Sequence, residues 1–204
     1  MSLPPVSDLS WLDVYAAQAF PPGTPTDRRT FYSPVDQVPK VLQVVVATAQ
    51  RSLVVAMYGF DDERLAMLIK KKLENAAVYV QLSLDSSQAG GVHEKVILAD
   101  ESYPASTIAI GRSEKGAIMH LKEVVIDGTI LVTGSTNWST GGETLQDNQL
   151  TVEYNPWACA VATARIGAIH ADMINKAHAL PREAPVVVRE PFFRRLTAFT
   201  RRQG

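Results

Sequence analysis

The sequence predicts an α/β protein in which helices cover the faces of a mixed β-sheet. Apolar segments with helical and with strand-like periodicity alternate between residues 40 and 85, and this order builds a sheet with crossover helices. An Asp-Gly pair at 127–128 divides two further apolar runs, as in an antiparallel hairpin. Hydrophobic residues make up 46% and charged residues 20% of the 204 residues, which is typical of one globular domain.

The elements can be placed in chain order from their periodicity and their end signals. Acidic residues open the segment 61–76 and lysines follow them, as suits the dipole of a helix. The alanine-rich segment 156–180 contains few helix breakers. The expected elements are a helix at 40–50, a strand at 52–60, a helix at 61–76, a strand at 78–85, a helical segment after Gly90-Gly91, strands at 106–112, 120–126, 129–133 and 150–154, and a final helix at 156–180.

Composition divides the chain into three parts. Residues 1–30 contain the proline cluster FPPGTPTDRRT at 20–30, and we expect an extended N-terminal arm rather than packed structure. Residues 31–180 form the folded domain. Residues 181–204 form a basic C-terminal tail with interleaved arginines and phenylalanines. This tail could bind nucleic acid through phosphate contacts and stacking, or could bury its aromatic side chains on a partner subunit.

The overall charge and the single cysteine narrow the partners and the compartment. A formal net charge of −1 gives no bulk attraction for nucleic acid or an anionic membrane, so a phosphate-binding surface must be local. Cys159 is the single cysteine, which excludes an intrachain disulfide and a cysteine-based zinc site. The first residues lack signal-peptide features and no apolar run is long enough to span a bilayer. We therefore expect a cytoplasmic protein, although a signal peptide that had been removed would leave no trace.

The stretch AIMHLKEVVIDGTILVTGSTNWS at 117–139 places reactive side chains at regular intervals along the predicted hairpin. Side chains two apart in a strand project to the same side, so His120 and Lys122 would aim an imidazole and an ammonium at one anion. On the returning strand, Gly134 would let a ligand approach the backbone, and Ser135 and Asn137 offer hydrogen-bond donors. The hairpin therefore predicts a binding site for a phosphoryl-sized group.

This stretch resembles the complete signature of the phospholipase D superfamily, spacing included: His120-x-Lys122-x4-Asp127-x6-Gly134-Ser135-x-Asn137. The segments FYSP at 31–34, AMYGF at 56–60 and LDSSQ at 84–88 are similar to segments of its small bacterial phosphodiesterases and nucleases. The resemblance covers residues 30–180. It implies a phospholipase D-like catalytic domain at 31–180 with one motif per chain.

The resemblance also implies a mechanism and a quaternary structure. Relatives of this kind use two copies of the motif around one active site, so we expect a homodimer with a shared site. One His120 would attack phosphorus to give a phosphohistidine, and the other would protonate the leaving oxygen. Lys122, Ser135 and Asn137 would stabilise charge on the non-bridging oxygens, so that neither a metal nor a cofactor is required.

Two positions leave alternatives open. Asp127 could shape the turn before its glycine, or it could support catalysis by orienting a histidine. Relatives with nuclease activity usually carry a glutamate eleven residues beyond the motif asparagine, where this chain has Asn148. Asn148 can hydrogen-bond a substrate but supplies no negative charge, and Asp147 or Glu143 could substitute for the missing carboxylate.

Other polar residues near the motif have two readings as well. Arg112 and Lys115 could contact a substrate phosphate, or they could lie in a solvated turn. His93, Lys95 and Asp100 repeat the first part of the motif, but no Gly-Ser-x-Asn follows them. We interpret this repeat as a coincidence, with a degenerate second site or a substrate contact as the alternative.

The sequence thus predicts a metal-independent phosphodiesterase of the phospholipase D type. Nucleic acid is the expected substrate, because small single-motif relatives often cleave it. A phospholipid-hydrolysing enzyme is one alternative, although the chain shows no membrane anchor and no amphipathic basic helix before its tail. A non-catalytic, dimeric DNA-binding or assembly module is another, because Asn148 departs from the pattern of active nucleases.

Overall fold

The computed structural model describes residues 7–88 and 106–179. The helical segment expected after Gly90-Gly91, with its repeat of the motif at His93, Lys95 and Asp100, lies outside the described residues. The basic tail at 181–204 lies outside them as well.

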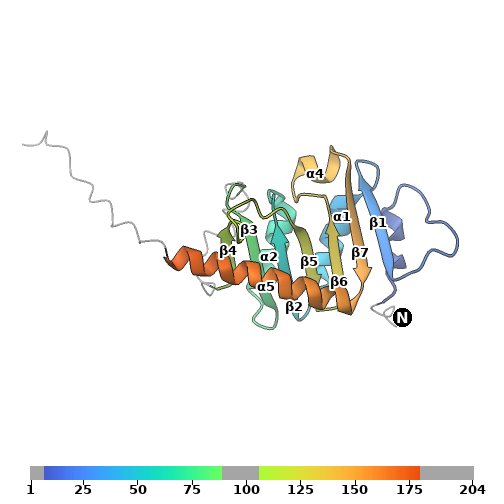
Figure 1. Cartoon of the computed structure of the whole chain (residues 1–204). Coiled ribbons are helices and arrows are strands. Elements are labelled where there is room, and N and C mark those ends of the chain that lie inside the picture. The colour runs from blue at the N-terminus through green and yellow to red at the C-terminus, as the bar shows by residue number, and fades with distance from the viewer. Residues whose placement is uncertain (1–6, 89–105, 180–204) are drawn as a thin grey trace, which may run out of the picture.

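A seven-stranded mixed sheet forms the centre of the molecule (Figure 1). Its spatial order is β1-β7-β6-β5-β2-β3-β4, in which β2, β3 and β4 are parallel neighbours and all other pairs are antiparallel. The α/β class with a mixed sheet is therefore confirmed. The strands are β1 (Arg28–Ser33), β2 (Ser52–Met57), β3 (Tyr79–Asp85), β4 (Ile108–Gly111), β5 (Lys122–Ile126), β6 (Ile130–Gly134) and β7 (Asn148–Tyr154).

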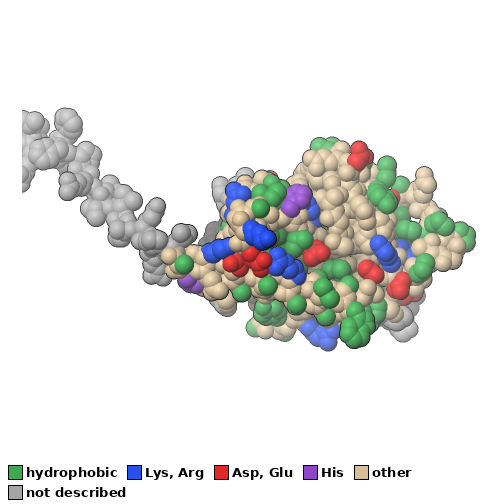
Figure 2. All heavy atoms as spheres, in the orientation of Figure 1, with side chains coloured by type: hydrophobic (Ala, Val, Ile, Leu, Met, Phe, Trp, Pro, Cys, Tyr) green, Lys and Arg blue, Asp and Glu red, His purple; other side chains and the backbone are tan. Residues whose placement is uncertain are grey.

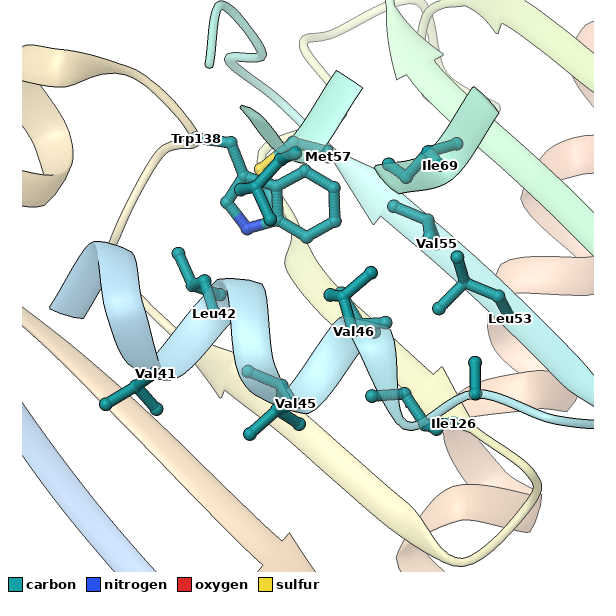
Figure 3. Packing of buried hydrophobic residues seen from close by; sticks show 14 of the residues in the cluster. Val41, Leu42, Val45, Val46, Leu53, Val55, Met57, Ile69, Ile126 and Trp138 are labelled. Atoms are coloured by element: carbon teal, nitrogen blue, oxygen red, sulfur yellow. The ribbon is translucent and has the colours of Figure 1, made fainter. Parts of the chain in front are cut away.

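Helices cover both faces of this sheet. The long helix α5 crosses one face, α1 and α2 pack on the other, and the short α4 lies at the sheet edge above β6 and β7 in the view of Figure 1. In Figure 3, α1 turns Leu42 and Val46 toward β2 and Trp138. All three side chains are at most 1% exposed. The helical segments are η1 (Ser10–Tyr15), α1 (Val38–Ala47), α2 (Glu63–Leu73), α4 (Thr140–Thr144) and α5 (Pro156–Ala179).

Local signals explain where α2 begins and ends. The Asp62 side chain accepts a hydrogen bond from the Leu65 N–H at 2.7 Å, which satisfies one of the free amides at the helix start. Lysines occupy the last turn, where their charge complements the helix dipole. The acidic start and basic end that the sequence shows thus coincide with the helix ends.

The N-terminal segment is packed against the domain, which differs from the extended arm that its prolines predict. Leu9 and Leu12 are fully buried in the main core. Asp13 forms an ion pair with Arg29 of β1, whose side chain is 3% exposed. Two leucines and one carboxylate therefore fix this segment, because their contacts are long-range and outweigh the local preference of the neighbouring prolines.

Asp127 and Gly128 form the turn between β5 and β6, as their sequence predicts. Both have positive φ, 53° and 69°, as a type I′ turn requires. The Thr129 N–H donates to the Ile126 carbonyl at 3.0 Å and closes the turn.

The inner side of α5 holds two reactive residue types in inert settings. His170 is 7% exposed. Its Nε2 donates to the Ser106 carbonyl at 2.6 Å, and its Nδ1 lies 3.0 Å from the Ser83 hydroxyl. Cys159 is fully buried, and burial, followed by the charge of Glu153, raises the pKa of its thiol to about 11. No helix within the described residues is both long and apolar enough to cross a membrane.

Candidate active site at one edge of the sheet

One edge of the sheet collects most of the residues that the motif singles out. β1, β2 and β6 end at this edge, whereas β5 and β7 begin there, because their antiparallel pairing alternates the chain direction. The edge therefore carries residues from the strand ends and from the adjoining loops. These residues are Ser33, Tyr58, His120, Lys122, Ser135, Asn137 and Asn148.

His120 and Lys122 meet beside the ring of Tyr58. The ring centroids of Tyr58 and His120 lie 4.7 Å apart, and the Lys122 Nζ lies 4.8 Å from the centroid of the Tyr58 ring. Nζ also donates to the His120 carbonyl at 3.0 Å. An exposed imidazole thus stands next to an ammonium that is held in place by an aromatic face and a carbonyl.

The predicted pairing of these two residues is found, although β5 begins only at Lys122. The ladder between β2 and β5 continues for one more bond, from the Tyr58 N–H to the Leu121 carbonyl at 2.9 Å. His120 therefore lies just beyond the strand, where it remains exposed. Tyr58 was not identified as a site residue from the sequence, although it lies in the AMYGF segment.

Burial changes the charge properties of Lys122. Its side chain is 7% exposed, and this desolvation lowers the pKa of the ammonium below its usual value of 10.5. A cation with little hydration gains more from a bound anion than an exposed lysine does. Lys122 is thus suited to hold a phosphate oxygen.

The backbone before His120 is fixed by Asp85 at the end of β3. The Asp85 carboxylate accepts a hydrogen bond from the Met119 N–H at 2.6 Å and another from the Ser87 N–H at 2.9 Å. Its side chain is 1% exposed. One signal of this role is visible in the sequence, because Asp85 places a carboxylate at the end of a buried strand.

The Asn137 side chain lies beside Gly59, the residue that follows Tyr58. A Cβ at position 59 would lie 3.1 Å from the Asn137 Cγ, which is a tight contact, so Gly59 leaves room for the amide. The Trp138 N–H donates to the Gly59 carbonyl at 2.8 Å and holds the two segments together. The Asn137 Oδ1 is buried and has no hydrogen-bond partner in the part of the chain that the structure describes.

Ser135 and Asn148 form a hydrogen-bonded pair. The Ser135 hydroxyl donates to Asn148 Oδ1 at 2.9 Å and accepts from the Gln149 N–H at 3.0 Å. Asn148 Nδ2 donates to the Gly142 carbonyl at 3.0 Å. Asn148 thus takes a structural place beside the motif serine, and its neutral amide directs the hydroxyl proton.

The reason for Gly134 differs from the one expected. A Cβ at this position would lie 2.1 Å from the Gln149 carbonyl oxygen, so the space is filled by the backbone of β7. Its φ of 157° adds to this restriction. Gly134 is therefore needed for the close approach of two strands.

Asp127 is not brought to the site. It lies at the other end of β5, roughly 20 Å from His120 by the rise per strand residue. Its carboxylate accepts hydrogen bonds from the N–H groups of Gln50, Arg51 and Ser52, the last two at 2.7 and 2.9 Å. These bonds fix the entry into β2, so the placement fits the turn reading and does not fit a catalytic role.

Neither carboxylate proposed to replace the missing glutamate does so clearly. Glu143 is 1% exposed, and burial, followed by the charge of Asp62 and a hydrogen bond with it, raises the pKa of Glu143 to about 9. It is therefore a neutral acid near pH 7. Asp147 is exposed and borders a pocket of about 300 Å³ together with Ser135 and Asn148.

A second, larger pocket of about 580 Å³ borders His120 and runs beside α5. Its wall is mostly apolar, and Ile118 and Val161 remain 43% and 72% exposed. Glu123 also borders it, and burial raises the pKa of this carboxyl. The pocket offers room beside the imidazole for an uncharged group.

The surrounding surface carries mixed charge. Figure 2 shows positive and negative side chains gathered together over α5 and the loop above it. Arg165 pairs with Glu114 at 2.9 Å and Lys176 with Asp172 at 2.7 Å. Arg112 and Lys115 are exposed on the turn that precedes His120, and among the residues that the structure describes no hydrogen bond or ion pair ties either one to the site. In residues 7–88 and 106–179, no group of three His, Cys, Asp or Glu side chains could hold a metal ion.

Comparison with known proteins shows the family of the chain. The family model described as cardiolipin synthase, PLD-like domain, matches residues 43–167. The mitochondrial cardiolipin hydrolase of Chlamydomonas reinhardtii is 25% identical over 111 residues, which are 54% of this chain and 48% of that protein. The chain thus spans about half the length of this curated relative.

Two solved structures share the fold. NucT from Helicobacter pylori has a TM-score of 0.62 at 21% identity. The aligned region covers 71% of this chain and 96% of the NucT chain. Nuc from Salmonella typhimurium, a phospholipase D family member, has a TM-score of 0.60 at 18% identity and covers 71% and 94%. Because the family model matches more than half of the 204 residues, the chain belongs to the phospholipase D superfamily, in the family of its PLD-like domains.

Proposed function

We propose that the protein is a metal-independent phosphodiesterase that acts through a phosphohistidine on His120. The observation that carries the proposal is the cluster at the sheet edge. It contains the exposed imidazole of His120 and the desolvated ammonium of Lys122, whose Nζ lies 3.0 Å from the His120 backbone carbonyl oxygen. The Asn137 amide and the Ser135 hydroxyl belong to the same edge. Such a set can bind a phosphodiester and stabilise charge on its non-bridging oxygens.

The chemistry requires two histidines in different protonation states. The neutral imidazole of His120 forms a bond to phosphorus, and the bond from phosphorus to the leaving oxygen breaks. His120 of the partner subunit, as imidazolium, gives that oxygen its proton. Water then attacks phosphorus while the partner's His120 accepts the water proton, and the N–P bond breaks to restore both residues.

One chain supplies one His120, so the proposal includes a homodimer whose two-fold axis passes through the site. In such an isologous arrangement each subunit contributes the same residues. Lys122 and Asn137 of each chain would surround the phosphoryl group. Arg112 and Lys115, exposed before His120, would reach substrate phosphates beyond the scissile one.

The substrate is the finer part of the proposal. Nucleic acid remains the first candidate, as the sequence predicts for a small domain with one motif. A phospholipid is the second candidate, and two observations favour it. The matching family model and the curated relative are both named for cardiolipin enzymes, and a largely apolar pocket of about 580 Å³ borders His120.

The test offers single-stranded DNA, RNA and cardiolipin-containing vesicles to the wild type in EDTA, beside His120→Ala. His178→Ala is the matched control, because this histidine is exposed on α5 and has no place in the proposed chemistry. We expect turnover of one substrate class that survives EDTA, is unaffected in the control and is lost in His120→Ala. An acid-labile phosphate on His120 would support the intermediate. Binding of DNA without any turnover would instead favour a non-catalytic module.

A further inference from the structure

Glu143 is a buried acid that the proposed chemistry does not use. It lies in α4, next to the site, with a side chain that is 1% exposed. Among the described residues its Oε1 has no hydrogen-bond partner, and the nearby Asp62 side chain raises the pKa of the Glu143 carboxyl through its charge and a hydrogen bond, after the larger effect of burial. Two carboxyl groups in contact at a buried position can share a proton, because two ionised groups would repel each other there.

Asp62 is held as the acceptor of this pair. It is the N-cap of α2, and its Oδ1 accepts from the Leu65 N–H at 2.7 Å. A carboxylate is the form that caps a helix N-terminus best. The proton of the pair therefore belongs on Glu143, whose pKa is raised to about 9 by burial and then by Asp62. Glu143 is thus a hydrogen-bond donor at neutral pH.

The residue before Glu143 contacts both asparagines of the site. The Gly142 carbonyl accepts hydrogen bonds from Asn148 Nδ2 at 3.0 Å and from the Ser33 hydroxyl at 3.1 Å. A Cβ on Gly142 would lie 2.6 Å from the Asn137 carbonyl oxygen, so the two backbones are in close contact. A shift of α4 would therefore move Asn148 and Asn137 together, and Ser135 with them through its bond to Asn148.

We propose that Glu143 is a positioning residue of the active site. As a carboxylic acid it donates a hydrogen bond to Asp62, and this bond ties α4 to the start of α2 and keeps Asn137, Asn148 and Ser135 in place for the phosphoryl group. The inference rests on the proposed function, since it assigns a purpose to a group beneath that site.

One charged group, Asp62, acts on the Glu143 carboxyl among the described residues. α1 and β1 pack against α4. The titratable residues of α1 and β1 are Lys40, Arg28, Arg29 and Tyr32. The bond from Glu143 to Asp62 thus depends on one proton.

Two substitutions separate donation of a hydrogen bond from mere filling of space. Glu143→Gln keeps a donor of the same length and cannot ionise, whereas Glu143→Met keeps the length and loses the donor. Leu145→Ala is the control, because Leu145 caps the C-terminal end of α4 and is 74% exposed. We expect the glutamine variant to retain activity and the methionine variant to lose about 10- to 100-fold in kcat/KM, as for other displaced site residues.

The pH profile supplies a readout that a purely structural role would not move. Wild-type activity should fall as the pH passes about 9, because ionised Glu143 repels Asp62, and this step should be absent in Glu143→Gln. Titration of Lys122 affects both proteins alike. Equal profiles of the two proteins, or equal losses in the glutamine and methionine variants, would overturn the proposal.

A second measurement does not depend on turnover. Binding of inorganic phosphate, followed by calorimetry, should be weakened in Glu143→Met and retained in Glu143→Gln, with circular dichroism to confirm that both are folded. Activity that is unchanged in His120→Ala would refute the proposed function but leave this comparison decisive for Glu143. Unchanged phosphate binding in the methionine variant would refute the positioning role alone.

Discussion

Glu143→Gln should make the protein more stable, although it replaces a buried carboxylic acid that is hydrogen-bonded in the wild type. Glu143 has a folded-state pKa of about 9 against an ordinary value of 4.5. Between these two pH values the folded protein holds a proton that the unfolded chain has lost. The free energy of unfolding therefore falls as the pH rises, and it is greatest below the pKa that Glu143 has in the unfolded chain. Glutamine keeps the hydrogen bond to Asp62 and escapes this penalty.

The size of the effect follows from the linkage of protonation and folding. Each pH unit between the unfolded and the folded pKa of Glu143 lowers the free energy of unfolding of the wild type by about 1.4 kcal/mol. At pH 7 the sum is about 3 kcal/mol, since that pH lies about 2.5 units above the ordinary value of Glu143. This is an upper value, because the glutamine amide brings a second N–H that also needs a partner. In a domain of this size it corresponds to a rise of about 6–12 °C in Tm.

Urea unfolding at several pH values between about 5 and 8.5 measures this difference directly. The gap between Glu143→Gln and wild type should be small at the acid end and should widen steadily with pH, at a constant m-value. Asp147→Asn is the matched control, because it removes an exposed carboxylate from the same loop. Parallel curves for Glu143→Gln and wild type would show that Glu143 is ionised in the folded protein, and the reasoning above would fail.

Three further predictions concern the strands that carry the motif. Lys122→Arg should shift the alkaline loss of kcat/KM to higher pH, because burial lowers the pKa of Lys122 while arginine stays charged; a pH-rate profile tests this. Asp127→Ala should destabilise the fold by about 1–3 kcal/mol, because the backbone amides of Gln50, Arg51 and Ser52 lose their acceptor. The kcat of the folded protein should not change. A lower kcat would show that Asp127 has a catalytic role after all. Gly134→Ala should unfold readily in a thermal scan, because its Cβ would meet the Gln149 carbonyl at 2.1 Å, whereas Gly167→Ala, in open space on α5, should be neutral or stabilising.

Much of the fold could be predicted because its strands and helices have strong periodic patterns. The helices at 40–50 and 61–76 and the hairpin around Asp127-Gly128 were found within a few residues of α1, α2, β5 and β6. β1 was not identified as a strand, since it follows a proline cluster and owes its conformation to pairing with β7. The packing of Leu9 and Leu12 was missed for the same reason, because both depend on distant parts of the chain.

The grouping of the candidate site residues could be predicted where it follows from their spacing in the sequence. Lys122 and His120 meet as expected, because two residues at a strand start stay close whatever else folds around them. The role of Asn148 could not be foreseen, since its bond to Ser135 joins two strands that only the sheet brings together. The neutral state of Glu143 was equally hidden, because burial and a second carboxylate create it and neither is visible in sequence.

The buried thiol of Cys159 makes this chain convenient for site-directed labelling. It is the one cysteine of the sequence, it is fully enclosed between α5 and the sheet, and with a pKa of about 11 it contains almost no thiolate at neutral pH. A cysteine introduced at the exposed Leu145 would therefore react alone with a fluorophore or spin label. Because α4 stands at the edge that holds His120, labels on two chains of the proposed homodimer would report the distance between the two copies of this edge.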